Sequence, residues 1–396
     1  MWRSTNSFDT SSRFNHRNTT SSGECGTVLR LMLPLSLLFF LTAPAIYAAQ
    51  EWPLWKSYTA RFMDSQIRVI DHDGGERTTS EAQAYAMFFA LVANDQARFD
   101  GLLRWTEQNL ASGDLSAHLP AWLWGRTADN RWGVVDSNPA ADADVWMAYT
   151  LLEAGRAWND KRYTQLGTAL AQHVAKEEVA VVPGLGAMLL PAPKGFHKAD
   201  SYRLNASYVP LQVLIGLSHL LPKGPWEQIA ASTPTLITKS APHGFAMDWI
   251  EFSKTGAFEP SALGSYEAIR VYLWAGMLDP KTPHRDEVLK ALSGMNEYLR
   301  LKGLPPAKVK RDGTIEDPKG PVGFSGALLP SLSAASEGGL RNQQMSRVQS
   351  ELDPATGLYG KPAKYYDQNL LLFALGSEEH RFWFDSQGEL KTSWKN

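Results

Sequence analysis

Acidic side chains at three predicted helix starts are the residues of this chain that are best suited to chemistry. The first is Glu81, which follows a good N-cap residue, Ser80, and opens a segment whose other face is apolar. An acid in the first turn of a helix often serves only to balance the helix dipole and the unpaired amide groups. The alternative is a catalytic role, because a carboxyl group placed in this way can exchange a proton with a substrate.

The other two acidic helix starts lie further along the chain. Asp142 and Asp144 end a loop that also contains Asp136 and lead into an apolar helix, where they would serve as N-cap and first-turn acids. A calcium loop is disfavoured, because the loop glycine and the closing bidentate glutamate are missing at the required spacing. The third start contains Glu267, three residues before Arg270, and a surface ion pair is the simpler interpretation of that spacing.

Helical periodicity recurs between loops, and alternating β-branched runs are few, which predicts a mainly α protein. We expect twelve helices at about 51–66, 81–94, 97–111, 142–158, 160–176, 207–219, 225–238, 265–276, 285–301, 326–336, 340–351 and 365–375. A dozen helices arranged as hairpin pairs favour an α/α barrel over a helical solenoid, which is the alternative. The long loops at 181–206, 239–264 and 303–326 are rich in Gly and Pro and are typical of functional loops.

Residues 1–49 do not belong to this pattern, and we interpret them as an N-terminal extension with a signal peptide. Arg30 precedes a short apolar run and then small residues, so we expect cleavage after Ala48 or Ala49. An uncleaved anchor is the alternative, although the apolar run is shorter than the ~20 residues of a spanning helix. A translation start near Val28 is a further hypothesis. Residues 50–396 show no shift in composition, which predicts a single domain.

Composition excludes several classes of protein. The only cysteine, Cys25, lies in the extension, so the exported protein would have neither a disulfide nor a cysteine metal site. Loss of residues 1–49 changes the formal charge from −2 to −4, and this mildly acidic balance argues against nucleic acid or anionic membranes as partners. No two of the nine His are spaced as zinc ligands on one helix. The 14 Trp and 13 Tyr suit stacking on sugars, but they are also ordinary core residues.

The sequence resembles glycoside hydrolase family 8, and the resemblance runs from Trp52 over nearly all of the remaining chain. The blocks that carry it are 79–85, 119–125, 136–138, 142–155, 182–191, 265–274 and 320–325. The resemblance implies an all-α, (α/α)6 barrel of one domain, whose long loops form an open groove for β-1,4-glucan. It also implies hydrolysis with inversion and without a metal or an organic cofactor.

Inverting hydrolysis requires one protonated carboxyl group and one ionised carboxylate, about 6.5 to 9.5 Å apart on opposite sides of the bond. The resemblance assigns Glu81 as the general acid and Asp142 as a residue that binds the sugar beside the scissile bond. Asp144 is expected to assist in substrate binding. A nearby aspartate would also raise the pKa of Glu81 and keep it protonated.

The sequence departs from the family at the general base. The family motif is Tyr-Asp-Ala-x-Arg, whereas this chain has Tyr266-Glu267-Ala268-Ile269-Arg270. Glu267 keeps the charge but adds one methylene, and a misplacement of about an ångström can reduce the rate on the order of a hundredfold. We predict Glu267 as the base, with Asp248 in reserve. Arg270 would orient Glu267 and keep it ionised, and Tyr266 would contact the sugar.

Several aromatic residues lie in or beside loops at predicted helix ends, where they could stack on sugar rings. These residues are Trp122, Trp124, Tyr208 and Trp249. Core packing is the alternative for each of them, since the amphipathic ring suits both uses. Two further tryptophans within apolar helices, Trp146 and Trp274, are assigned to the core.

The resemblance therefore predicts a periplasmic endo-β-1,4-glucanase that acts during bacterial cellulose synthesis and secretion. Its expected partners are the β-1,4-glucan and a cellulose synthase complex, without nucleic acid and without stable membrane insertion once the signal peptide is removed. A glucan-binding or cellulose-assembly factor with weak turnover is the alternative. An inverting xylanase or chitosanase is the third.

Overall fold

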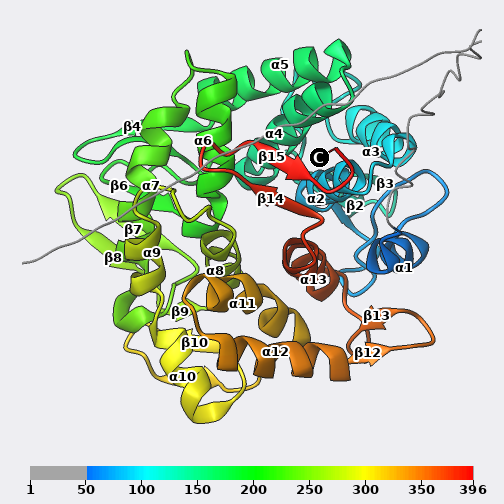
Figure 1. The fold of residues 1–396 in the computed structure, drawn as a ribbon. Coiled ribbons are helices and arrows are strands. Elements are labelled where there is room, and N and C mark those ends of the chain that lie inside the picture. The colour runs from blue at the N-terminus through cyan, green and yellow to red at the C-terminus, as the bar shows by residue number, and fades with distance from the viewer. Residues whose placement is uncertain (1–50, 396) are drawn as a thin grey trace, which may run out of the picture. The chain divides into compact units, whose positions relative to one another are not determined.

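The computed structural model describes residues 51–395, and this part of the chain is mainly helical (Figure 1). Its thirteen α-helices are α1 (Pro53–Phe62), α2 (Ser80–Val92), α3 (Gln96–Asn109), α4 (Ala141–Ala157), α5 (Lys161–Glu177), α6 (Leu211–Leu220), α7 (Trp226–Ser240), α8 (Ile269–Gly276), α9 (Arg285–Ala291), α10 (Gly294–Lys302), α11 (Val322–Ala334), α12 (Gly338–Ser350) and α13 (Tyr365–Glu378). Each segment with predicted helical periodicity contains a helix. The predicted all-α class is confirmed.

One predicted helix, 285–301, is divided into α9 and α10. The break lies at Leu292 and Ser293, just before Gly294, whose backbone packs against another segment. A Cβ on Gly294 would lie only 2.3 Å from the carbonyl oxygen of His243. The division therefore reflects a tertiary contact that helical periodicity does not reveal.

The helices alternate along the chain between an inner and an outer ring (Figure 1). The inner ring consists of α2, α4, α6, α8, α11 and α13, and the outer helices that cover them are α3, α5, α7, α9, α12 and α1. Helix α2 is buried along nearly its whole length, whereas α5 buries a stripe of residues three or four positions apart. Six helix pairs of this kind form the predicted (α/α)6 barrel.

Aromatic rings fill the centre of the barrel. Phe373 on α13 contacts Phe89 on α2 with 4.6 Å between ring centroids, and this contact closes the inner ring. The same Phe373 ring lies 5.2 Å from Trp146 on α4 and 5.0 Å from Trp274 on α8. Both tryptophans are buried, which confirms that they are core residues. The contacts of Phe373 with Phe89 and Trp274 are edge-to-face, and contacts of this kind stabilise the core beyond the burial of apolar area.

The segments outside the helices form short antiparallel sheets. Their strands are β1 (Thr78–Thr79), β2 (Leu123–Arg126), β3 (Trp132–Asp136), β4 (Val179–Val182), β5 (Gly186–Leu189), β6 (Ser201–Leu204), β7 (Ile250–Ser253), β8 (Phe258–Pro260), β9 (Leu263–Gly264), β10 (Lys308–Lys310), β11 (Ile315–Asp317), β12 (Leu352–Asp353), β13 (Leu358–Tyr359), β14 (Phe382–Phe384) and β15 (Leu390–Thr392). The sheets are β1-β2-β3, β4-β5, β6-β7-β8, β11-β10-β9, β12-β13 and β14-β15. Strands of two to five residues are too short for sequence alternation to detect.

The predictions for residues 1–49 lie outside the described residues, and these include the signal peptide, its cleavage site, the anchor and the alternative start. Within residues 51–395, no helix combines the length and the apolar character that crossing a membrane would require.

Candidate active site

Arg270 lies at the centre of a cluster of acidic side chains at one end of the barrel. Its guanidinium is buried in the first turn of α8, and Nη1 donates to Glu81 and, over 2.7 Å, to Asp142. The other terminal nitrogen, Nη2, donates to Glu267. Glu81 lies in the first turn of α2, Asp142 lies in the first turn of α4, and Glu267 lies in the turn before α8. The three helix starts singled out in the sequence therefore converge on one cation.

A small sheet fixes the entry into α2. Thr79 in β1 pairs with Leu123 in β2, and the amide of Ser80 donates to the carbonyl of Trp122 over 3.0 Å. The Thr79 hydroxyl then caps the helix by accepting from the Ala82 amide over 3.1 Å. The N-cap is therefore Thr79, one residue before the predicted Ser80, because the β1–β2 pairing sets where the helix begins.

Glu267 is held from two sides. Arg270 binds one face of its carboxylate, and Asn205 donates to the same Oε2 over 3.3 Å. Ser207, in the 3-10 turn Ala206–Tyr208, lies 3.5 Å from that oxygen through its hydroxyl. About a third of the Glu267 side chain stays exposed, so the carboxylate is fixed and still accessible.

Asp248, the reserve candidate for the general base, binds the turn that carries Glu267. Its Oδ1 accepts from the amides of Ser265 and Ala268 over 2.7 and 2.9 Å, and its Oδ2 accepts from the Ser265 hydroxyl over 2.7 Å. Both oxygens are therefore engaged by the turn that carries Glu267. Asp248 is a positioning residue for this turn, and the structure does not favour it as the base.

The electrostatics of the cluster favour one bound proton. Three carboxylates surround a single guanidinium, so the fully ionised cluster would carry a net charge of −2 in a buried setting. The pKa of Glu81 is raised to about 8, chiefly by burial and also by Asp142 and Glu267, while Arg270 opposes the shift. Burial also raises the pKa of Asp142. Glu81 accordingly keeps a proton at neutral pH, as a general acid must.

An open pocket of about 390 Å³ exposes Glu81, Glu267 and Arg270. Tyr266 and Tyr366 line it, and the Tyr366 hydroxyl donates to the Tyr266 carbonyl over 2.5 Å. The Tyr266 side chain is 45% exposed, although it packs edge-on against another ring. This position suits the predicted contact of Tyr266 with a sugar.

The predicted sugar platforms form two groups beside the cluster. Trp122, just before β2, and Trp124, on β2, are half-buried, and so are Tyr208 and Trp249, which form the second group. Tyr208 lies nearer the centre, because the Arg270 guanidinium is 5.6 Å from its ring. Tyr208 and Trp249 also contact each other, with 6.0 Å between centroids. Two of these rings already stack within the protein, Trp124 on Trp132 and Trp249 on Phe196. The role of all four in substrate binding stays a prediction.

Asp144 does not face the pocket. It is fully buried together with Glu178 at the end of α5, and no cation contacts either group among the described residues. Burial raises the pKa of both carboxyl groups well above the usual range. Because it is buried, Asp144 has no direct access to the pocket here, and its assistance in substrate binding stays a prediction. Asp142 and Asp144 are two residues apart on a helix that turns about 100° per residue, so they point to nearly opposite sides.

Some residues of the site were missed by sequence reasoning. Tyr85, whose hydroxyl lies 3.2 Å from Arg270 Nη1, follows Glu81 by one helical turn, and this spacing was a usable signal. Trp132 on β3 is 42% exposed and stacks on Trp124 with 5.1 Å between centroids. A turn lies between these two tryptophans, so a hairpin was predictable. No local sequence pattern indicated that Asn205 belongs to the site.

The site consists of acidic, guanidinium and aromatic groups. Within residues 51–395, no group of three or more His, Cys, Asp and Glu side chains could hold a metal ion. An α/α barrel with two glutamates that line one open pocket, one of them with a pKa of about 8, has the groups that hydrolyse glycosidic bonds. The protein is a glycoside hydrolase.

Comparison with known proteins gives the family. The chain belongs to glycosyl hydrolases family 8, which matches residues 29–380. It is 42% identical over 372 residues to an endoglucanase of Escherichia coli O157:H7, covering 93% of this chain and 97% of the relative. It is also 42% identical over 362 residues to an endoglucanase of Xanthomonas axonopodis pv. citri, covering 90% of this chain and 93% of the relative.

A solved structure is similar over its whole length. The endo-1,4-D-glucanase of Vibrio fischeri ES114 is 39% identical and superposes with a TM-score of 0.82, covering 87% of this chain and 100% of that chain. The family resemblance seen in the sequence and the (α/α)6 barrel are both confirmed.

Proposed function

We propose that this protein is an inverting endo-β-1,4-glucanase in which Glu81 is the general acid and Glu267 the general base. The observation that carries the proposal is the position of both glutamates on one guanidinium, with a pKa of about 8 for Glu81. The names of the relatives support a glucan as the substrate.

In the proposed reaction, Glu81 donates its proton to the glycosidic oxygen as the bond from that oxygen to the anomeric carbon breaks. Glu267 accepts a proton from a water molecule, and the water oxygen forms the new bond to the anomeric carbon from the opposite face. The products are two shorter chains, and the new reducing end has inverted configuration. Arg270 holds Glu267 at the pocket, and Asp142 helps to fix Arg270 by accepting from its Nη1.

The test is hydrolysis of carboxymethylcellulose by the wild type, Glu81→Gln and Glu267→Ala. Hydrolysis is measured as the release of reducing ends. The account predicts that each variant loses about 10² to 10⁴ in kcat, the usual contribution of a general acid or base. Equal release by the wild type and Glu81→Gln would overturn the assignment of the acid.

The same assay separates the enzyme from a glucan-binding or cellulose-assembly factor. The glutamate at position 267 is the observation that favours such a factor, since the family motif has an aspartate there. A factor of this kind would bind the polymer and release almost no reducing ends. Proton NMR of products from xylan and chitosan would identify a different glycan as substrate.

We further propose that the enzyme acts in the periplasm on glucan strands that leave a cellulose synthase complex. This proposal rests on the predicted signal peptide in residues 1–49 and on the family resemblance. Fractionation of cells that produce the full chain tests it, together with mass spectrometry of the mature N-terminus. We expect a periplasmic protein that begins at residue 49 or 50, and retention in the cytoplasm would contradict the proposal.

A further inference from the structure

A second large pocket, here called the rear pocket, opens at the end of the barrel opposite Arg270. It has a volume of about 810 Å³, and the C-terminal ends of α8, α11 and α13 line it through Gly276, Ala334 and Ser377. The N-terminal end of α13 lines the catalytic pocket through Tyr365. At 1.5 Å per residue, the two ends of this helix are about 20 Å apart. The rear pocket is thus separate from the catalytic site.

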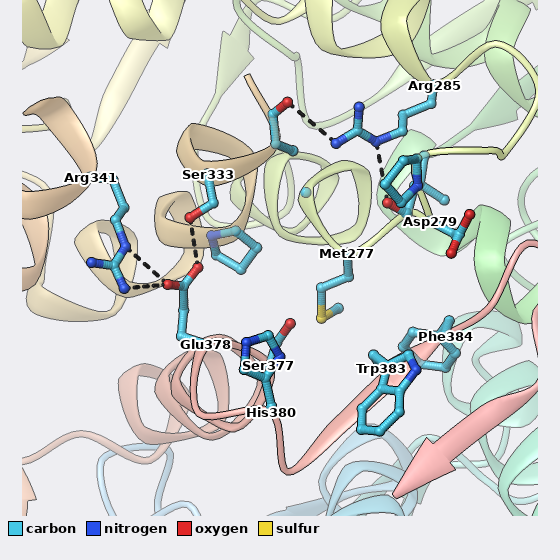
Figure 2. A pocket seen from close by; sticks show the side chains of 15 residues that line it. Met277, Asp279, Arg285, Ser333, Arg341, Ser377, Glu378, His380, Trp383 and Phe384 are labelled. Atoms are coloured by element: carbon cyan, nitrogen blue, oxygen red, sulfur yellow. Dashed lines mark hydrogen bonds and ion pairs between the residues drawn. The ribbon is translucent and has the colours of Figure 1, made fainter. Parts of the chain in front are cut away.

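An exposed tryptophan forms one wall of the rear pocket (Figure 2). Trp383 is the middle residue of β14, between Phe382 and Phe384, both of which are buried. Because successive side chains on a strand point to opposite faces, the two phenylalanines anchor the strand and turn Trp383 outward. Trp383 remains 39% exposed, and Met277 and His380 line the same pocket. This ring is therefore held rigidly without serving as core.

A fixed carboxylate forms the opposite wall. Glu378 accepts from Arg341 through Nε and Nη2, over 3.0 and 2.6 Å, and from the hydroxyl of Ser333 over 2.9 Å (Figure 2). These bonds leave acceptor capacity on the carboxylate, since two oxygens offer about four lone-pair sites. A hydroxyl group can both donate to such a carboxylate and accept from such a guanidinium.

The charges of the rear pocket balance. Asp279 and Glu378 are acidic, and Arg285 and Arg341 are basic. Arg285 is engaged by the protein, because it donates to the carbonyl of Leu278 over 3.2 Å. A balanced pocket of this kind does not select an ion. An aromatic face opposite hydrogen-bonding groups suits a neutral ligand that has one apolar face and a hydroxylated edge.

A pyranose ring has this character. We propose that the rear pocket binds a short segment of β-glucan, with Trp383 stacking on a sugar ring and Glu378 and Arg341 binding its hydroxyl groups. The identity of the ligand rests on the proposed function. The rear pocket would hold either the glucan chain that is cleaved at the other end of the barrel or a neighbouring glucan chain.

Binding is measured in the Glu81→Gln variant, which cannot cleave, by calorimetric titration with cellohexaose. We expect about two ligand molecules per protein, one at each pocket, and about one after Trp383→Ala is added. The loss of stacking should weaken the second site about tenfold or more. Trp383→Phe should retain that site, and Leu301→Ala on α10, a control with a side chain that is 80% exposed, should change nothing.

In the otherwise wild-type protein, Trp383→Ala should hydrolyse cellopentaose with unchanged kcat, which also verifies that the variant folds. The rear-pocket proposal alone would be overturned if Glu81→Gln bound about one ligand, if Trp383→Ala did not change this number, and if the wild type still cleaved glucan. Failure of the wild type to release sugars from any β-1,4-glucan would instead overturn the proposed function.

Discussion

Glu81 and Glu267 bind the two terminal nitrogens of one guanidinium, that of Arg270. The two glutamates come from different helix starts, so a single buried cation sets their mutual position. The two side chains differ in solvent exposure. Glu81 is the more enclosed of the two, and about a third of the Glu267 side chain is exposed. This asymmetry is what a reaction with one proton donor and one proton acceptor requires.

The pH dependence of the reaction should report Glu81. Its pKa is about 8 because burial disfavours the charged form, and the proton is needed for catalysis. We therefore expect kcat/KM to decline above about pH 8. Rates measured from pH 5 to 10 with a soluble glucan test this. A decline that begins two pH units lower would assign the acidic role to another group.

The pH dependence of stability should also change when Glu81 is replaced. Between pH 4.5 and about 8, the folded protein retains a proton on Glu81 that the unfolded chain has released, so rising pH lowers the free energy of unfolding. Glu81→Gln cannot ionise and escapes this loss. Its melting temperature should exceed that of the wild type by a few degrees at pH 8.5 and by less at pH 5. A constant difference at all pH values would show that Glu81 is not buried as a protonated acid.

Two substitutions of Glu267 should separate the effect of its negative charge from the effect of its side-chain length. Glu267→Asp keeps a carboxylate but withdraws it from Arg270 and Asn205, so we expect kcat to change by no more than about a hundredfold. Glu267→Gln keeps the length and loses the charge, so it should be the more damaged variant. Steady-state kinetics of the two variants provide the comparison. Higher activity in Glu267→Gln than in Glu267→Asp would contradict the role of Glu267 as base.

Asp248 should act through the turn that it caps. Asp248→Ala leaves the amides of Ser265 and Ala268 without their acceptor and should lower the stability by about 1 kcal/mol. It should also lower kcat more than it raises KM, since the displaced group is Glu267. Asp248→Asn retains one acceptor oxygen and should recover part of both effects. If stability falls but kcat is unchanged, Asp248 has no part in positioning Glu267.

The sequence predicted the helix starts of the site but not their relation in space. Acids after cap residues are local signals, which is why Glu81, Asp142 and Glu267 could be singled out. Their convergence on Arg270 depends on the order of helices in the inner ring, and no local pattern encodes it. The contact of Asp248 with the turn before α8 is equally non-local, since its partners Ser265 and Ala268 lie 17 and 20 positions further along the chain.

Elsewhere the errors have specific physical causes. The break between α9 and α10 follows from the close approach of Gly294 to His243, and the strands in the long loops are too short to show alternation. The burial of Asp144 was accessible in principle, because two residues along a helix reverse the direction of a side chain. The aromatic residues Trp146 and Trp274 were assigned correctly because the residues directly before and after each of them are apolar.

The anomeric configuration of the first product tests the central claim most directly. Cleavage of cellopentaose is followed by proton NMR within the first minutes, before mutarotation equilibrates the reducing ends. With Glu81 as acid and Glu267 as base, the new reducing end appears first as the α-anomer, and the β-anomer grows later. A β-anomer that appears first would mean retention through a covalent intermediate and would contradict the account.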